Sequence, residues 1–136
     1  MKSTLIDAGP IIALFDNSDQ YHERVLTFME SFEGRLISTW PVLTEVCYML
    51  DFNQETQLDF LDWVIMGGID VHNLEQWQLS SIRETMNTYS DLPADLADAT
   101  LLETAETRSL TSIVTLDKDF SVYKLKNGHY LKNLLG

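Results

Sequence analysis

The chain has 136 residues, of which 45% are hydrophobic, and no linker, low-complexity tract or internal repeat divides it, so we expect a single domain over residues 1–136 with a sizeable core. Its single cysteine, Cys47, excludes an internal disulfide and a cysteine-rich zinc site, and it favours a reduced, cytoplasmic setting. The formal net charge of −12, from 9 basic and 21 acidic residues, argues against a general affinity for the phosphates of nucleic acids.

Strands and helices are expected to alternate along the first half of the chain. A short strand at residues 3–6 stops at Asp7, and Pro10 suits the first turn of the helix that follows. Because Asp7 and Asp16 interrupt this apolar run, we expect neither a signal peptide nor a membrane span. The next expected elements are a helix at 19–33 closed by Gly34, a strand at 35–39, and helices at 41–52 and 54–66.

The second half of the chain continues the alternation. After Gly67 and Gly68 we expect a strand at 69–72, helices at about 75–88 and 93–105, a strand at 112–116, and one more strand near 129–131. Strands separated by helices imply βαβ units. The predicted fold class is therefore α/β, with a mostly parallel central sheet and helices on both faces.

Two aspartates directly follow predicted strands. Asp7 comes after STLI, and Asp117 comes after SIVTL. In open α/β sheets, ligands bind beyond the carboxyl ends of the strands. Aspartate is also a common N-cap and turn residue, so each position has an ordinary structural explanation as well.

Two further acids lie on apolar faces of predicted helices, Glu45 in PVLTEVCYML and Asp98 in PADLADATLLETA. The helical neighbours of Asp98 are Leu101, Leu102 and Ala105, with Glu103 on the opposite face, and those of Glu45 are Pro41, Tyr48, Met49 and Phe52. A lone carboxylate on such a face is costly to bury unless it is paired, protonated or bound to a cation. A salt bridge or an exposed side chain is the alternative, but no Lys or Arg lies three or four residues from Asp98.

These four acids are expected to converge, with Asp95 beside Asp98 as a possible fifth. Clustered carboxylates would take up protons unless a cation compensates them, and an all-oxygen ligand set suits Mg²⁺ or Mn²⁺. Such clusters commonly hydrolyse phosphodiester bonds with a metal-activated water. Other chemistries lack their motifs, because the sequence has no GxSxG, HExxH, Walker loop or GxGxxG.

Four segments, taken in order, resemble a known family: IDAGPIIALFD, TWPVLTEVCYML, DLPADLADATLLETAE and SIVTLDKDF. They are similar to segments of PIN-domain proteins, especially the VapC-type toxin ribonucleases of prokaryotes, and the resemblance spans nearly the whole chain. It implies a PIN-like, doubly wound sheet with an acidic pocket at the strand ends. It also implies a Mg²⁺- or Mn²⁺-dependent endoribonuclease that is the toxin of a toxin–antitoxin pair.

Residue by residue, the resemblance implies that the catalytic and metal-binding acids are Asp7, Glu45, Asp98 and Asp117, with Asp95 as an accessory metal ligand. Thr115 matches a residue that often supports the site, and Asp119 lies close to Asp117 as a second supporting acid. The family pattern is broken at Ala8 and Gly9, where many members have Ser or Thr followed by Asn.

Basic residues gather at the end of the chain, where RNA contacts are expected from Lys118, Lys124 and Lys126. Besides an RNA substrate, the resemblance implies a homodimer and a small antitoxin protein as partners.

Two other functions stay open on the sequence. A PIN-type module that has lost activity would still bind metal or nucleic acid, and the lack of a basic groove favours it. A phosphoryl-transfer domain of the receiver type would use Asp7 as its phosphoacceptor, with Lys118 beside Asp117. That function calls for paired acids after the first strand, and TLID supplies only one.

Overall fold

The computed structural model of the protein describes residues 2–136. The strands are β1 (Ser3–Ile6), β2 (Arg35–Thr39), β3 (Asp70–His72), β4 (Ser112–Val114) and β5 (Lys132–Asn133). The α-helices are α1 (Ala8–Phe15), α2 (His22–Ser31), α3 (Trp40–Met49), α4 (Gln54–Ile65), α5 (Leu79–Thr88) and α6 (Leu96–Arg108), and the 3₁₀ helices are η1 (Gln76–Gln78) and η2 (Lys118–Ser121). Among these described helices, none combines the length and the apolar character needed to cross a membrane.

The five strands form one parallel sheet in the order β3-β2-β1-β4-β5. The chain runs outward from β1 through β2 to β3, and it then returns to the other side of β1 for β4 and β5. Leu5 of β1 pairs with Ile37 on one side and with Ile113 on the other. The direction of winding reverses between β1 and β4, and such a switch point leaves a crevice at the carboxyl ends of the strands. The predicted doubly wound sheet is confirmed, with every strand pair parallel.

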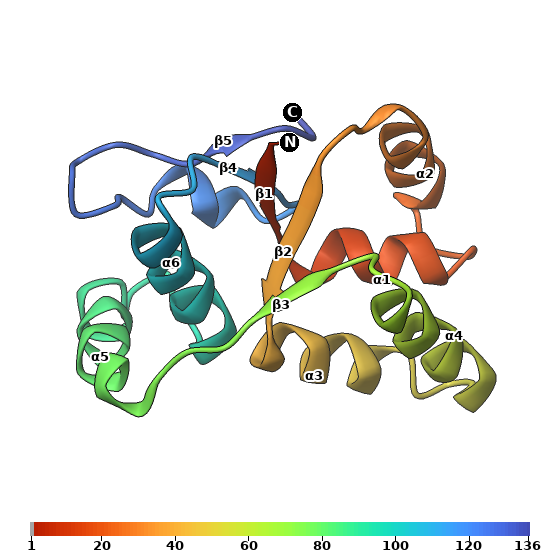
Figure 1. Ribbon diagram of the computed structural model, residues 1–136, viewed down its shortest axis with the longest axis horizontal. Helices are drawn as coiled ribbons and strands as arrows, with labels where there is room; N and C mark the ends of the chain where they lie inside the picture. The colour runs from red at the N-terminus through yellow and green to blue at the C-terminus, as the bar shows by residue number, and fades with distance from the viewer. Residues whose placement is uncertain (1) are drawn as a thin grey trace.

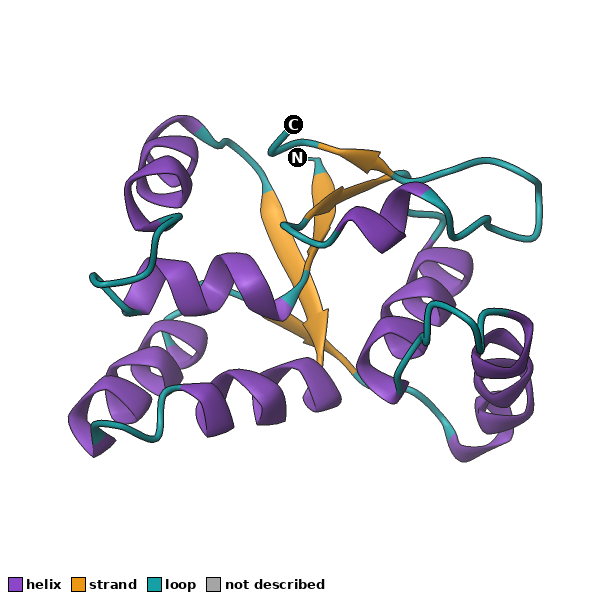
Figure 2. Cartoon of the chain, turned by 180° about the vertical axis from the view of Figure 1, so that it is seen from behind, coloured by secondary structure: helices purple, strands orange, loops and turns teal. Residues whose placement is uncertain are grey.

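Helices cover both faces of this sheet (Figure 1). Helices α1, α2 and α4 lie on one side and α5 and α6 on the other, as the view from behind in Figure 2 also shows. Helix α3 contacts both α1 and α6. Because the central strand β1 is covered on both faces, Leu5 and Ile6 are fully buried, which explains the continuous apolar run of this strand.

Element boundaries depart from the expected ones by up to three residues before residue 74, where α2 begins at His22 and α3 ends at Met49, and further departures follow after it. The helix expected at 75–88 opens with η1, and the helix expected from 93 begins at Leu96 because Asp95 caps it. The extra strand expected in the tail is present, but it lies at Lys132–Asn133, just after the expected 129–131. Tyr130 instead forms an isolated antiparallel bridge with Lys124. The chain turns back at Gly128, whose φ of 84° suits glycine, so the residues just after it pair with residue 124 and not with β4.

Candidate metal centre

Asp7 stands at the carboxyl end of β1 and caps the N-terminus of α1. Its Oδ1 accepts a hydrogen bond from the Ala8 amide at 2.8 Å, and its Oδ2 accepts one from the Thr115 hydroxyl at 3.0 Å. The residue is only 7% exposed. Burial raises the pKa of Asp7 from 3.8 to about 6; the two hydrogen bonds oppose this rise, and the negative charges of Glu45 and Asp117 add to it. The position therefore disfavours a bare carboxylate and favours one beside a cation.

Asp98 lies in the first turn of α6 and forms a capping box with Asp95. The Asp98 amide donates to Asp95 Oδ1 at 2.8 Å, and the Asp95 amide donates to Asp98 Oδ2 at 3.3 Å. Burial raises the pKa of Asp98 to about 7, and the negative charges of Asp95, Asp7 and Asp117 contribute to the rise. The two acids that begin this helix thus have a structural role in its cap, and Asp98 in addition faces other acids.

Asp117 reaches the same place from the loop after β4. The Thr115 hydroxyl accepts a hydrogen bond from the Asp117 amide at 2.9 Å while it donates to Asp7, so one hydroxyl links the two acids. Asp117 Oδ1 in turn accepts from the Asp119 amide at 2.9 Å and caps η2. Thr115 therefore contacts Asp117 through its side chain, whereas Asp119 contacts it through its backbone amide, which any residue at that position could supply.

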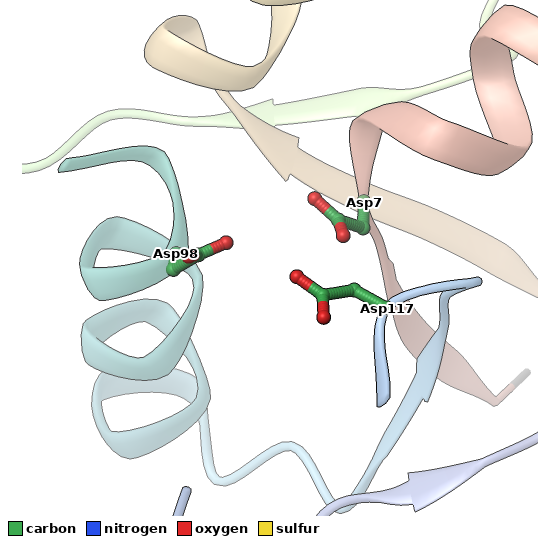
Figure 3. Close-up of side chains that lie close together, drawn as sticks. All are labelled: Asp7, Asp98 and Asp117. Atoms are coloured by element: carbon green, nitrogen blue, oxygen red, sulfur yellow. The ribbon is translucent and has the colours of Figure 1, made fainter. Parts of the chain in front are cut away.

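The three aspartates converge, as Figure 3 shows. One carboxylate oxygen from each of Asp7, Asp98 and Asp117 lies within 4.8 Å of the other two. They come from the end of β1, the start of α6 and the loop after β4, at the switch point of the sheet. An oxygen-only donor set of this kind suits Mg²⁺ or Mn²⁺. The raised pKa values of Asp7 and Asp98 fit the same conclusion, because a divalent cation would remove the cost of ionising them.

Glu45 approaches the cluster from α3 but stays at its rim. The side chain is exposed, and partial burial together with the charges of Asp95 and Asp117 raises its pKa. The expected burial on an apolar helix face is wrong, because Tyr48, Met49 and Phe52 are 72%, 51% and 61% exposed. The apolar face of α3 is therefore not what brings Glu45 close to the acids.

The three lysines expected to contact RNA lie in two different places. Lys118 is exposed and lines the same hollow as Thr115 and Asp117. Lys124 and Lys126 line a separate groove along α5, where the Lys126 ammonium donates to the Ser81 hydroxyl at 3.2 Å. The Lys124 Nζ lies 5.7 Å from the centre of the Tyr130 ring. Only Lys118 shares a hollow with one of the three converging aspartates.

Two residues that support the cluster were missed by sequence reasoning. The Tyr123 hydroxyl donates to Asp98 Oδ2 at 3.4 Å, and burial and the charge of Asp98 raise the pKa of this phenol, which keeps it a donor. The Asn133 side chain accepts from the Thr115 amide at 3.2 Å and donates to the Thr115 carbonyl at 3.1 Å. Neither residue has a spacing signal, because both contacts depend on how the tail packs.

Comparison with known proteins adds the following. The sequence model of the PIN domain matches residues 4–125. The crystal structure of VapC20 from Mycobacterium tuberculosis, a Sarcin-Ricin loop cleaving toxin, matches with a TM-score of 0.80 at 15% identity, over 88% of this chain and 93% of that one. At that identity the likeness shows a shared fold. No curated protein matches the sequence.

Proposed function

We propose, since the chain belongs to the PIN-domain family, that it is a Mg²⁺- or Mn²⁺-dependent endoribonuclease and the toxin of a toxin–antitoxin pair. The observation that carries this proposal is the convergence of Asp7, Asp98 and Asp117 at the switch point of the sheet. The shared fold with a Sarcin-Ricin loop cleaving toxin supports RNA as the substrate class.

Asp7, Asp98 and Asp117 would hold the ion in this proposal, with Glu45 and Asp95 beside them. When bound, a divalent ion supplies a water of lowered pKa and stabilises charge at the scissile phosphate. Thr115 keeps Asp7 and Asp117 in fixed relative positions, because its hydroxyl is bonded to both residues. Ligands that are already oriented need little rearrangement when the substrate arrives.

Glu45 is the residue we assign to proton transfer. Unlike the three converging aspartates it is exposed, and its neighbours keep its pKa above the ordinary value for a glutamate. Such a carboxylate is suited to accept a proton from an attacking water and to release it to solvent. Asp98 is a less suitable base, because it is already bonded to the Asp95 amide and the Tyr123 hydroxyl.

We further propose that residues 1–136 act as one nuclease domain in the cytoplasm, as a homodimer restrained by a small antitoxin. Large apolar side chains are exposed on α3, α4 and the turns that follow them: Tyr48, Met49, Phe52, Leu58, Ile65 and Met66. Groups of exposed large apolar side chains are typical of protein interaction sites when they adjoin one another. They support a protein partner on this side of the molecule.

The second candidate function is a PIN-type module that binds metal or nucleic acid without cleaving it. It is favoured by the net charge of −12 and by the position of Lys124 and Lys126 in a groove apart from the acids. Divalent-metal binding with no turnover of any RNA would support it.

The test of the proposed function is cleavage of a panel of single-stranded and structured RNAs by purified protein, with Mg²⁺ or Mn²⁺ and with EDTA. Asp98→Asn is expected to lower the rate by more than about 100-fold, since even partners behind a metal ligand contribute about 10–100-fold. Asp62→Asn is the matched control, because Asp62 is an exposed acid on α4. Equal rates for the wild type and Asp98→Asn would refute the proposal.

A further inference from the structure

A pocket of about 260 Å³ lies at the carboxyl ends of β2 and β3, on the same edge of the sheet as the acids. Its walls come from the first turn of α3, the end of β3, α5 and α6, and they include Trp40, His72, Leu79, Ile82, Leu96 and Thr100. The proposed chemistry uses none of these side chains. The pocket is smaller than the roughly 300 Å³ at which sites for drug-sized molecules begin.

The pocket and the acid cluster are separated by the first turns of α6. Leu96 and Thr100 line the pocket, whereas Asp98, two residues from each and thus about 200° around the helix, meets Asp7 and Asp117. Along the sheet edge, the pocket lies at β2 and β3 and the acids at β1 and β4. With adjacent strands about 4.8 Å apart, the two sites are about 10 Å apart. One extended strand of RNA crossing this edge would meet both.

The pocket wall contains a polar atom that lacks a partner. His72 Nε2 is buried, and it neither donates nor accepts a hydrogen bond within residues 2–136. Such atoms are rare in folded proteins and call for an explanation. Burial and the nearby positive charge of Arg108 lower the pKa of His72, which favours the neutral ring with one donor and one acceptor nitrogen. Because this atom is shielded from solvent, a ligand with a hydrogen-bonding edge would reach it only if the pocket wall shifts.

Trp40 supplies an aromatic ring at the same pocket. The residue is 59% exposed, and its Nε1 donates to Asn73 Oδ1 at 2.8 Å, which restricts the rotation of the indole. Unpaired bases of RNA stack on aromatic side chains. The combination of a restrained aromatic ring and apolar walls matches the flat, stacking face of a nucleobase.

We propose that this pocket receives one unpaired nucleobase of the RNA strand whose backbone passes the acids, and that it thereby sets the position of cleavage. The proposal rests on the proposed function. Base recognition of this kind suits a chain of net charge −12, because it does not depend on phosphate contacts. The size of the pocket admits a single base and not a base pair, so the RNA is unpaired at this position.

The test compares Trp40→Ala with Trp77→Ala. Trp77 is the comparison because it is also exposed, at 77%, and lines the groove along α5 with Lys124 and Lys126, the other place where RNA contacts are expected. Binding of fluorescein-labelled hexamers of A, C and U is measured by anisotropy in EDTA, where no cleavage occurs. We expect one base to be preferred. Trp40→Ala should weaken its binding by about 5- to 100-fold, the loss expected for one stacked base, and Trp77→Ala by less than about twofold.

Cleavage by the same proteins separates this proposal from the proposed function. With Mg²⁺, Trp40→Ala should raise KM or shift the cleavage position, whereas Asp98→Asn should abolish cleavage and still bind the hexamer in EDTA. Equal binding and cleavage by the two tryptophan variants would overturn the base pocket and leave the nuclease in place. Binding that depends on Trp40 without cleavage by the wild type would overturn the nuclease and leave the pocket. A Trp40-dependent dimer in sedimentation, with no hexamer binding, would show a subunit interface and also overturn the base pocket.

Discussion

Replacing Asp7 with Asn should stabilise the protein when no divalent metal is present. Asp7 is 7% exposed, and its pKa is raised from 3.8 to about 6. Because the folded-state value is the higher one, the protonated carboxyl stabilises the fold at low pH, and this stabilisation is lost as the pH rises through 6. Asn stays neutral at every pH and is a good N-cap for α1, so it avoids the loss.

The size of the effect follows from the pKa shift. A rise from 3.8 to about 6 corresponds to about 3 kcal/mol between the protonated and ionised forms at pH 8. About 1 kcal/mol of this is forfeited, because the NH₂ group of Asn cannot accept the hydrogen bond that the Thr115 hydroxyl gives to Asp7. We therefore expect Asp7→Asn to be more stable than the wild type by about 2 kcal/mol at pH 8, or roughly 6–8 °C in Tm.

Thermal and urea unfolding in EDTA, at pH 5 and pH 8, measure this difference. Titration of Asp7 should lower the stability of the wild type by about 1 kcal/mol between these pH values, and the variant should lack this part of the decrease. Asp62→Asn on the exposed face of α4 controls for the change in net charge. If Asp7→Asn is no more stable than the wild type at pH 8, ionisation of Asp7 does not destabilise the folded protein as its raised pKa implies.

Three further predictions concern the same cluster. Millimolar Mg²⁺ or Mn²⁺ should raise the Tm of the wild type by several degrees and leave that of Asp98→Asn unchanged, because binding to the folded state alone stabilises it; equal shifts would argue against this site. Tyr123→Phe should keep the fold and weaken metal binding by about 2- to 10-fold, because one hydrogen bond to Asp98 is lost. Calorimetric titration measures this affinity, and an unchanged value would show that the hydrogen bond does not support the metal site. Glu45→Gln should lower kcat at saturating metal more than it lowers metal affinity, whereas the reverse pattern would make Glu45 a ligand and not a base.

The sheet could be predicted because each of its main strands is recognisable from its own residues. STLI, RLIST and SIV are short runs of apolar and β-forming residues, and both faces of the central strand are covered by helices. β2 has the predicted bounds, and the carboxyl ends of β1 and β4 precede Asp7 and Asp117 as expected. The strand order β3-β2-β1-β4-β5, which brings these ends together, was not predicted, because alternation of strands and helices implies parallel strands but not which strands are neighbours.

The first turn of α6 carries the sequence pattern of a capping box, which was not predicted. Two acids spaced three residues apart before an apolar run are typical of a capping box, and Asp95 and Asp98 form one. Glu103, on the face expected to be opposite the core, is buried because α5 packs over it, and it accepts a hydrogen bond from Gln78. Helical periodicity shows which residues share a face, but it does not show how many neighbours the helix has.

Glu45 and the tail show what the sequence could not predict. Glu45 lies near Asp95 and Asp117 as expected, but the apolar helix face from which this was argued is exposed, so only the resemblance gave a sound reason for it. The contacts of Tyr123 with Asp98 and of Asn133 with Thr115 join segments far apart in the chain. No spacing rule reports such contacts, because they arise only once β5 and η2 pack against the sheet end.

The most direct test of the metal centre is the anomalous difference density of crystals grown with millimolar Mn²⁺ at pH 8. One strong peak is expected, about 2.1 Å from a carboxylate oxygen of each of Asp7, Asp98 and Asp117. A well-ordered cluster with no peak between these oxygens, or Mn²⁺ bound only elsewhere, would contradict the conclusion that the three aspartates form one divalent-metal site.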